Sequence, residues 1–114
     1  MSQLMTAADL DAAFSAPAAL LFKNSTTCPI SAAARHEMQR LLEQRPDAPL
    51  LVVDVNAHAD LSREIARRTG IEHDSPQIIL LTHGAPRWHA SHYAIQAGDV
   101  AHELDALVAD RDAA

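Results

Sequence analysis

The sequence predicts an α/β fold, in which a four-stranded mixed sheet is flanked by helices and preceded by one extra short N-terminal helix. Short continuous apolar runs, which are typical of buried strands, alternate with segments of helical periodicity along most of the chain. Near the C-terminal third, two strand-like segments are separated by a His-Gly pair, which favours a hairpin. A length of 114 residues suits one domain with its own core, so we expect a single domain over residues 1–114.

The first two elements are a short helix and a strand. Thr6 and Asp9 stand three residues apart, as in a capping box with Asp in place of the usual Glu or Gln. We therefore expect a helix over about residues 7–15, which Pro17 ends. The apolar run over residues 18–23 then predicts a buried strand.

A long helix, a central strand and a further helix follow. Residues 29–44 repeat apolar side chains at helical spacing and stop before a proline, which predicts an amphipathic helix. Its apolar stripe consists of Ile30, Ala34, Met38 and Leu41. Residues 50–55 are almost continuously apolar, as expected of a strand covered on both faces. Asn56 is then expected to cap a helix over residues 59–69, with Gly70 just beyond its C-terminus.

The last elements are a hairpin and a C-terminal helix. Residues 77–82 and 87–91 predict two strands joined by the turn at 83–84. The helix that opens at 98–99 is expected to bury Val100, Leu104, Leu107 and Val108. Because a crossover helix joins the first two strands, we expect them to run parallel with a right-handed connection. This order of elements resembles that of a thioredoxin-like domain with one additional N-terminal helix.

Composition and charge argue against several classes of protein. The formal net charge is −6 with neutral histidines, which disfavours a general binder of nucleic acid or of anionic membranes. The single cysteine, Cys28, excludes an intramolecular disulfide and a Cys₄ or Cys₂His₂ zinc site within one chain. No apolar run approaches 18 residues, and the first nine residues lack the pattern of a secretory signal. We therefore expect a cytoplasmic protein without a membrane partner.

Cys28 stands where the first strand ends and the long helix begins, with Pro29 suited to the first helical position. The free N–H groups of Ile30 and Ser31, together with the positive end of the helix dipole, would stabilise a thiolate at this place. We therefore predict a reactive thiol whose pKa lies below that of an unfolded peptide. The alternative is that Cys28 is a small buried hydrophobic residue without chemistry.

Ser31 occupies the position at which a dithiol redox enzyme needs its second cysteine to resolve a mixed disulfide. The motif Cys28-Pro29-Ile30-Ser31 therefore restricts redox chemistry to a monothiol route, in which a second molecule supplies the resolving thiol. Ser31 can still donate a hydrogen bond to a thiolate. Pro76 precedes the third strand and, on sequence pattern alone, is only a proline at a strand start.

Three segments closely resemble the YtxJ family of monothiol bacilliredoxins, the bacillithiol counterparts of glutaredoxins. They are STTCPIS at residues 25–31, SPQ at 75–77 and WHASHY at 88–93. The resemblance extends from about residue 18 to residue 108, and Tyr93 departs from it at a place where tryptophan is expected. It implies a thioredoxin fold, with Pro76 in a cis peptide bond against the active cysteine and with Ser75 offering its backbone to an extended thiol substrate.

The resemblance also implies an activity. The thiolate of Cys28 would attack the bacillithiol sulfur of a modified client protein, and a second bacillithiol would then release Cys28 and leave as bacillithiol disulfide. Bacillithiol is thus a co-substrate, and no bound cofactor is implied. The implied partners are bacillithiolated client proteins and a separate disulfide reductase that recycles bacillithiol disulfide. The residues implied in substrate binding are Thr27, Pro29, Ser31, Ser75, Pro76, His92 and Lys23.

Several charged residues have two interpretations. Lys23 could bind a carboxylate of the bacillithiol malate group, or it could simply extend to solvent at a strand edge. His92 could approach the cysteine, or it could satisfy backbone groups where the last strand ends. His73 and Asp74 could line the rim of the site. The helix over 59–69 carries three arginines, Arg63, Arg67 and Arg68. They form either an ordinary solvated face or a docking surface for clients.

Two other functions remain open. A glutaredoxin-like protein could use another low-molecular-weight thiol or hold an iron–sulfur cluster between two monomers, although Pro29 beside the cysteine disfavours a cluster. A non-catalytic thioredoxin-fold adaptor would bind a partner and use Cys28 little or not at all. A metal site is not expected, because His89 and His92 fall on opposite faces of a strand.

Overall fold

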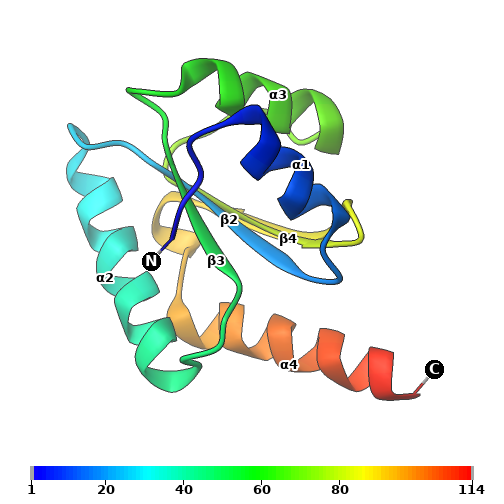
Figure 1. Ribbon diagram of the computed structural model, residues 1–114. Helices are drawn as coiled ribbons and strands as arrows, with labels where there is room; N and C mark the ends of the chain where they lie inside the picture. The colour runs from blue at the N-terminus through cyan, green and yellow to red at the C-terminus, as the bar shows by residue number, and fades with distance from the viewer. Residues whose placement is uncertain (1, 114) are drawn as a thin grey trace.

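Within the described residues 2–113, a five-stranded mixed sheet carries two helices on each face (Figure 1). The structure is a computed structural model, which describes side chains for residues 2–110. The strands, in the order β1-β3-β2-β4-β5, are β1 (Ser2–Gln3), β3 (Leu50–Asp54), β2 (Ala19–Asn24), β4 (Gln77–Thr82) and β5 (Ala85–Ser91). The helices are α1 (Ala7–Ser15), α2 (Pro29–Gln44), α3 (Ala59–Thr69), α4 (Ala97–Ala113) and the short 3₁₀ helix η1 (His92–Ala94).

The connections between strands confirm the predicted topology. Strands β2 and β3 pair in parallel and are joined by α2, whereas β4 pairs antiparallel with both β2 and β5. The turn between β4 and β5 contains two residues with positive φ, His83 and Gly84. The carboxyl ends of β2 and β3 and the amino end of β4 therefore meet at one edge of the sheet, and α2 and α3 both begin at this edge.

The core consists of two apolar layers, one on each face of the sheet. On β2, Leu20 and Phe22 pack with α2 and α4, whereas Ala19 and Leu21 pack with α1 and α3. Because successive side chains of a strand point to opposite faces, a strand between two layers must be apolar at every position. Lys23 continues this strand and is also fully buried, which makes it the charged exception in the middle of the sheet.

The prediction of four strands was wrong by one edge strand. Ser2 lies opposite Leu51 and Gln3 opposite Val52, and the Leu4 amide donates to the carbonyl of Val52 at 2.8 Å. Backbone hydrogen bonds hold β1 in place, while its two polar side chains point to solvent. A two-residue polar segment has no alternation of apolar side chains, so the sequence contained no signal for it.

The bounds of α1, α2, α3 and β4 agree with the predictions residue for residue. The capping box at α1 is confirmed, because the Asp9 amide donates to Thr6 Oγ1 and the Thr6 amide donates to Asp9 Oδ2. Gly70 ends α3 with φ of 73°, a left-handed conformation that glycine adopts without strain.

Other details were wrong. Strand β2 is shifted by one residue, β3 ends one residue earlier and β5 begins two residues earlier than predicted. Helix α4 begins at Ala97, and Val108 is about half exposed although the periodicity placed it in the core. The N-cap of α3 is His58, so the cap that Asn56 was expected to provide does not form.

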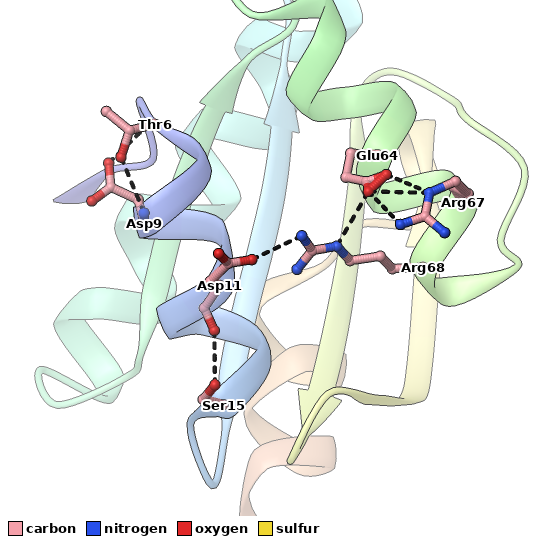
Figure 2. A network of polar contacts seen from close by, with 7 residues as sticks. All are labelled: Thr6, Asp9, Asp11, Ser15, Glu64, Arg67 and Arg68. Carbon is pink, nitrogen blue, oxygen red and sulfur yellow. Dashed lines mark hydrogen bonds and ion pairs between the residues drawn. The ribbon is translucent and has the colours of Figure 1, made fainter.

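A chain of ion pairs joins α1 to α3 on one face of the sheet. Figure 2 shows the carboxylate of Asp11 on α1 facing the guanidinium of Arg68 on α3, with 2.8 Å between Oδ1 and Nη2. Glu64 accepts hydrogen bonds from both Arg67 and Arg68, and the Arg68 guanidinium lies 5.1 Å above the ring of Phe14. Among residues 2–113, no helix has the length and apolar character needed to cross a bilayer.

Candidate active site

Cys28 is the N-cap residue of α2 and follows the carboxyl end of β2 by four residues. Its backbone is extended, with φ of −103° and ψ of 124°, and Pro29 takes the first helical position as predicted. Proline fits there because its missing N–H would have no partner in the first turn. Cys28 is partly exposed, which suits a residue that must meet a reactant.

The surroundings of Cys28 lower the pKa of its thiol below the ordinary value of 9.0. The backbone N–H of Ser31 contributes most, and the N–H of Ile30 and the hydroxyl of Ser31 act in the same direction, while partial burial opposes them. The sulfur makes no regular capping hydrogen bond, so these donors favour the thiolate by their proximity and by the direction of the helix dipole. The direction agrees with the prediction made from the motif.

Ser31 is fully buried and holds the loop that precedes the cysteine. Its Oγ accepts a hydrogen bond from the amide of Ser25 at 3.2 Å. Because the oxygen accepts from Ser25, the hydroxyl hydrogen stays available for the sulfur of Cys28. Ser31 therefore both fixes the loop and stabilises the thiolate. A cysteine at this position would make weaker hydrogen bonds, because a thiol is a weak donor and a weak acceptor.

Asn56 ties the loop over residues 25–27 to the neighbouring strand connection, and sequence analysis missed this role. Its Oδ1 accepts from Ser25 Oγ at 3.1 Å, from the amide of Thr26 at 3.0 Å and from Thr26 Oγ1 at 3.3 Å. Asn56 is itself held by Asp54, because its backbone N–H donates to the Asp54 carboxylate at 2.9 Å. Ser25 Oγ also lies 3.2 Å from Thr27 Oγ1, so the contacts extend to the residue before Cys28.

The peptide bond between Ser75 and Pro76 is cis, as the resemblance implied. The segment before it is fixed by Asp74, whose Oδ1 accepts from the Ser75 amide at 2.9 Å and lies 2.9 Å from His92 Nε2. The His92 amide donates in turn to the Pro76 carbonyl at 3.0 Å. His92, with φ of 55°, is thus brought beside Ser75 and Pro76 by the end of β5, and both its backbone and its ring contact this segment.

Lys23 lies inside the protein, so the interpretation in which it extends to solvent at a strand edge was wrong. Its side chain has no exposed surface, and Nζ lies 3.2 Å from Nδ1 of His73. Burial lowers the pKa of Lys23 to about 8, while the charge of Asp74 acts in the opposite direction. Burial, followed by the nearby Lys23 charge, lowers the pKa of His73, so a neutral ring accepts from the lysine.

The site residues named from the sequence fall into two groups. The loop and helix residues, which are Thr27, Cys28, Pro29 and Ser31, form one continuous segment at the edge of the sheet. A second cluster lies at the amino end of β4 and consists of Ser75, Pro76 and His92. Lys23 contacts His73, which precedes this cluster in the chain. In the part of the chain that the structure describes, no three His, Cys, Asp or Glu residues are grouped to hold a metal ion.

Comparisons with known proteins agree with this geometry. A family model described as monothiol bacilliredoxin BrxC matches residues 2–100. A solved structure of a candidate oxidoreductase with a thioredoxin fold is 28% identical, with a TM-score of 0.82, covering 89% of this chain and 90% of that one. Mitochondrial thioredoxin 3 from Saccharomyces cerevisiae in its oxidised form is 12% identical, with a TM-score of 0.72 and coverage of 92% and 93%. Thioredoxin from Trypanosoma brucei brucei is 14% identical, with a TM-score of 0.74 and coverage of 95% and 90%.

Proposed function

The chain belongs to the monothiol bacilliredoxin BrxC family, and from this premise we propose that it removes bacillithiol from mixed disulfides on client proteins. The family and the thioredoxin fold establish the broader statement, a thiol redox function. The observation that carries the finer proposal is the partly exposed Cys28 at the N-terminus of α2, with a serine in the fourth position of its motif. This arrangement suits exchange through one thiol.

The proposed reaction consists of two thiol–disulfide exchanges. The Cys28 thiolate attacks the bacillithiol sulfur of the client, the bond between that sulfur and the client sulfur breaks, and the client leaves as a thiolate. Cys28 now carries bacillithiol in a disulfide. A second bacillithiol thiolate attacks the bacillithiol sulfur, forms bacillithiol disulfide and frees the Cys28 thiolate. A separate disulfide reductase would return bacillithiol disulfide to the thiol form.

The donors around Cys28 help both steps. A lowered thiol pKa increases the thiolate fraction for the attack and makes Cys28 a better leaving group in the second exchange. The amide of Ser31, which has the largest effect, belongs to the first turn of α2 and can act on the sulfur in both steps. We place this chemistry in the cytoplasm, where a lone thiol stays reduced.

Bacillithiol is a co-substrate in this proposal, and neither exchange step calls for a resident cofactor. The segment from Asp74 to Pro76 would bind the extended substrate through backbone groups, with His92 keeping the segment in place. Thr27 and Pro29 flank the cysteine and would contact whichever sulfur compound approaches it. The Ser75 hydroxyl is buried and has no hydrogen-bond partner among the described residues, so the contact with the substrate is assigned to the Ser75 backbone.

The test is a transfer experiment with two matched peptides. One peptide carries bacillithiol on its cysteine, and the other carries glutathione on the same residue. Intact mass of the purified protein should show one added bacillithiol on Cys28 from the first peptide and little from the second, with Cys28→Ser as the inactive control. Equal transfer from both would replace bacillithiol specificity with a general thiol exchange. Transfer from neither would contradict the proposal and favour the adaptor function.

A further inference from the structure

A small cavity with a positive lining lies at the same edge of the sheet as Cys28, on the face covered by α3. Its volume is about 130 Å³, and it is lined by Val55, Ala59, Ser62, Arg63 and His73. A water molecule occupies ~30 Å³ in the liquid, so this space accommodates a carboxylate group and its adjoining carbon atoms. None of the lining residues is acidic, although the whole chain has a net charge of −6.

The donors at this cavity have no partners of their own. Ser62 is 2% exposed, and its hydroxyl has no hydrogen-bond partner among the described residues. A buried hydroxyl without a partner costs free energy, so its presence points to a bound group that satisfies it. Arg63 makes no ion pair with any side chain described in residues 2–110, in contrast to Arg67 and Arg68 on the same helix.

The amino end of α3 adds a second source of attraction for an anion. The N-cap residue His58 makes no side-chain capping hydrogen bond, so the first-turn amides of this eleven-residue helix are not capped. Such amides, aligned with the helix dipole, favour a negative group. Ala59, the first helical residue, lines the cavity.

Lys23 supplies a positive charge next to the cavity, and the neutral ring of His73 lies between the two. The ring nitrogen Nδ1 of His73 accepts from the buried ammonium of Lys23, so the other ring nitrogen carries the hydrogen and can donate. The neighbouring carboxylate of Asp74 is engaged by His92, and the carboxylate of Asp60 is on an exposed residue. The lysine therefore has no carboxylate partner within the protein at ion-pair distance among the described side chains.

The cavity adjoins the loop that carries Cys28. Val55, in its wall, donates its amide to the carbonyl of Asn24, and Asn56 accepts from Thr26, two residues before the cysteine. His73, which also lines the cavity, precedes Ser75 by two residues. A molecule whose sulfur reaches Cys28 could therefore place an acidic group here.

We propose that this cavity binds a carboxylate of the exchange partner, with Ser62, Arg63 and the first amides of α3 as donors and Lys23 as the supporting charge. The assignment to an exchange partner rests on the proposed function, whereas anion binding itself does not. The carboxylate belongs either to the low-molecular-weight thiol or to an acidic residue near the modified cysteine of a client. The chemistry of recognition is the same in both cases.

Anion binding is tested first, without any exchange reaction. The amide signals of the ¹⁵N-labelled protein are followed while sodium acetate replaces sodium chloride at constant ionic strength. Saturable shifts are expected at Ala59, Asp60 and Leu61. Ser62→Ala should weaken acetate binding on the order of tenfold or more, because one hydrogen bond to a charged group is lost. This variant should fold normally, since the hydroxyl it removes has no partner in the protein.

The matched control is Arg40→Ala, which removes a cation on α2 that pairs with Glu37. Arg63→Ala should weaken acetate binding, and Arg40→Ala should leave it unchanged. The absence of saturable shifts, or equal effects of the two arginine variants, would overturn the anion site. Because acetate contains no sulfur, this result does not depend on whether Cys28 exchanges bacillithiol.

Two further arms identify the source of the carboxylate. In one arm, exchange is measured with a bacillithiol whose carboxylates are free or esterified. In the other, the cysteine of the peptide is flanked by glutamate or by glutamine. If esterification slows exchange in the wild type but not in Ser62→Ala, the site binds the low-molecular-weight thiol. If replacing glutamate by glutamine slows exchange in the wild type but not in Ser62→Ala, the site binds the client. No loss in either arm, with acetate still bound, would refute a role in exchange.

Discussion

The side-chain oxygen of Asn56 accepts hydrogen bonds from both the amide and the hydroxyl of Thr26, at 3.0 and 3.3 Å, across 30 residues of sequence. The loop before Cys28 is therefore attached to the connection between β3 and α3. Since the sulfur of Cys28 reacts from this loop, its position depends on a residue outside the Cys-Pro-Ile-Ser motif. Asn56 acts through Thr26 and Ser25, which makes it a positioning residue.

Replacing Asn56 by alanine should slow exchange at Cys28 by ~5-fold, which corresponds to about 1 kcal/mol of lost hydrogen-bond free energy. The loop would sample other positions, so the loss should appear mainly in the rate of the chemical step. Stopped-flow alkylation and exchange rates measure it. Asn56→Asp keeps the acceptor oxygen and should restore most of the rate. Equal defects in the two variants would contradict a role based on the acceptor oxygen.

Asn56 also shows why part of the site could not be predicted. An asparagine three residues before a helical pattern fits an N-cap by its residue type, and nothing local distinguishes a cap from a tether to a distant loop. The distinction depends on the parallel pairing of β2 with β3, which brings Asp54 beside Asn24. The positions of Cys28, Pro29 and Ser31 were predictable because they depend on one strand-to-helix junction that the sequence displays.

The fold was predictable for a similar reason. Two apolar layers on one sheet require long apolar runs on β2, β3 and β4, and these runs are visible in the sequence. Strand β1 left no such signal, because backbone pairing to β3 holds it. The burial of Lys23 was also invisible, since a lysine at the end of an apolar run usually reaches solvent, and only the position of His73 gives it a partner here.

Ser31→Ala should raise the pKa of Cys28 and slow its reaction at neutral pH. The hydroxyl of Ser31 helps to lower that pKa, although less than the Ser31 amide, which the substitution keeps. The rate of alkylation against pH should therefore shift its midpoint upwards without reaching that of an unfolded peptide. An unchanged midpoint would show that the serine hydroxyl does not act on the sulfur.

The same substitution should destabilise the fold. The amide of Ser25 is buried and donates to Ser31 Oγ, so alanine leaves it without a partner. A loss of about 1–2 kcal/mol in the free energy of unfolding is expected. Urea unfolding followed by circular dichroism measures this loss. The wild type and Ser31→Ala are compared at a pH below the thiol pKa, where Cys28 is protonated. The loss measured there therefore contains no effect of the thiolate.

The Glu64 carboxylate should make stability sensitive to acid. The guanidinium of Arg67 has the largest effect, followed by further contributions from Arg67 and Arg68, and together they lower the pKa of Glu64 from 4.5 to about 2 (Figure 2). In the unfolded chain the pKa returns to about 4.5. The stabilisation is therefore complete above pH 4.5 and is lost as the pH falls towards 2.

The measurement is the urea midpoint between pH 5 and pH 2 for the wild type and for Glu64→Gln. The variant should show a smaller fall in stability across this range, because it lacks the carboxylate. Glu43→Gln is the matched control: Glu43 lies on the exposed face of α2 and makes no ion pair among the described side chains. The interpretation fails if both variants keep the slope of the wild type.

Lys23 should give the protein a rise in stability with alkaline pH. Its pKa is lowered by burial to about 8 in the folded chain and is about 10.5 when unfolded. Between these values the unfolded chain holds a proton that the folded chain has released, so the free energy of unfolding increases with pH. Below pH 8 the cost of burying the ammonium is present in full. Above pH 10.5 it is absent.

The experiment benefits from Lys23 being the only lysine in the sequence. Lysine labelled with ¹³C next to Nζ gives a single side-chain signal, whose titration should have its midpoint near pH 8 rather than above 10. Urea midpoints are measured in parallel in a Cys28→Ser background, because the thiol also titrates in this range. Lys23→Met, of similar length and without charge, should lose the alkaline rise. A lysine signal that titrates above pH 10 would mean that the ammonium reaches solvent in solution.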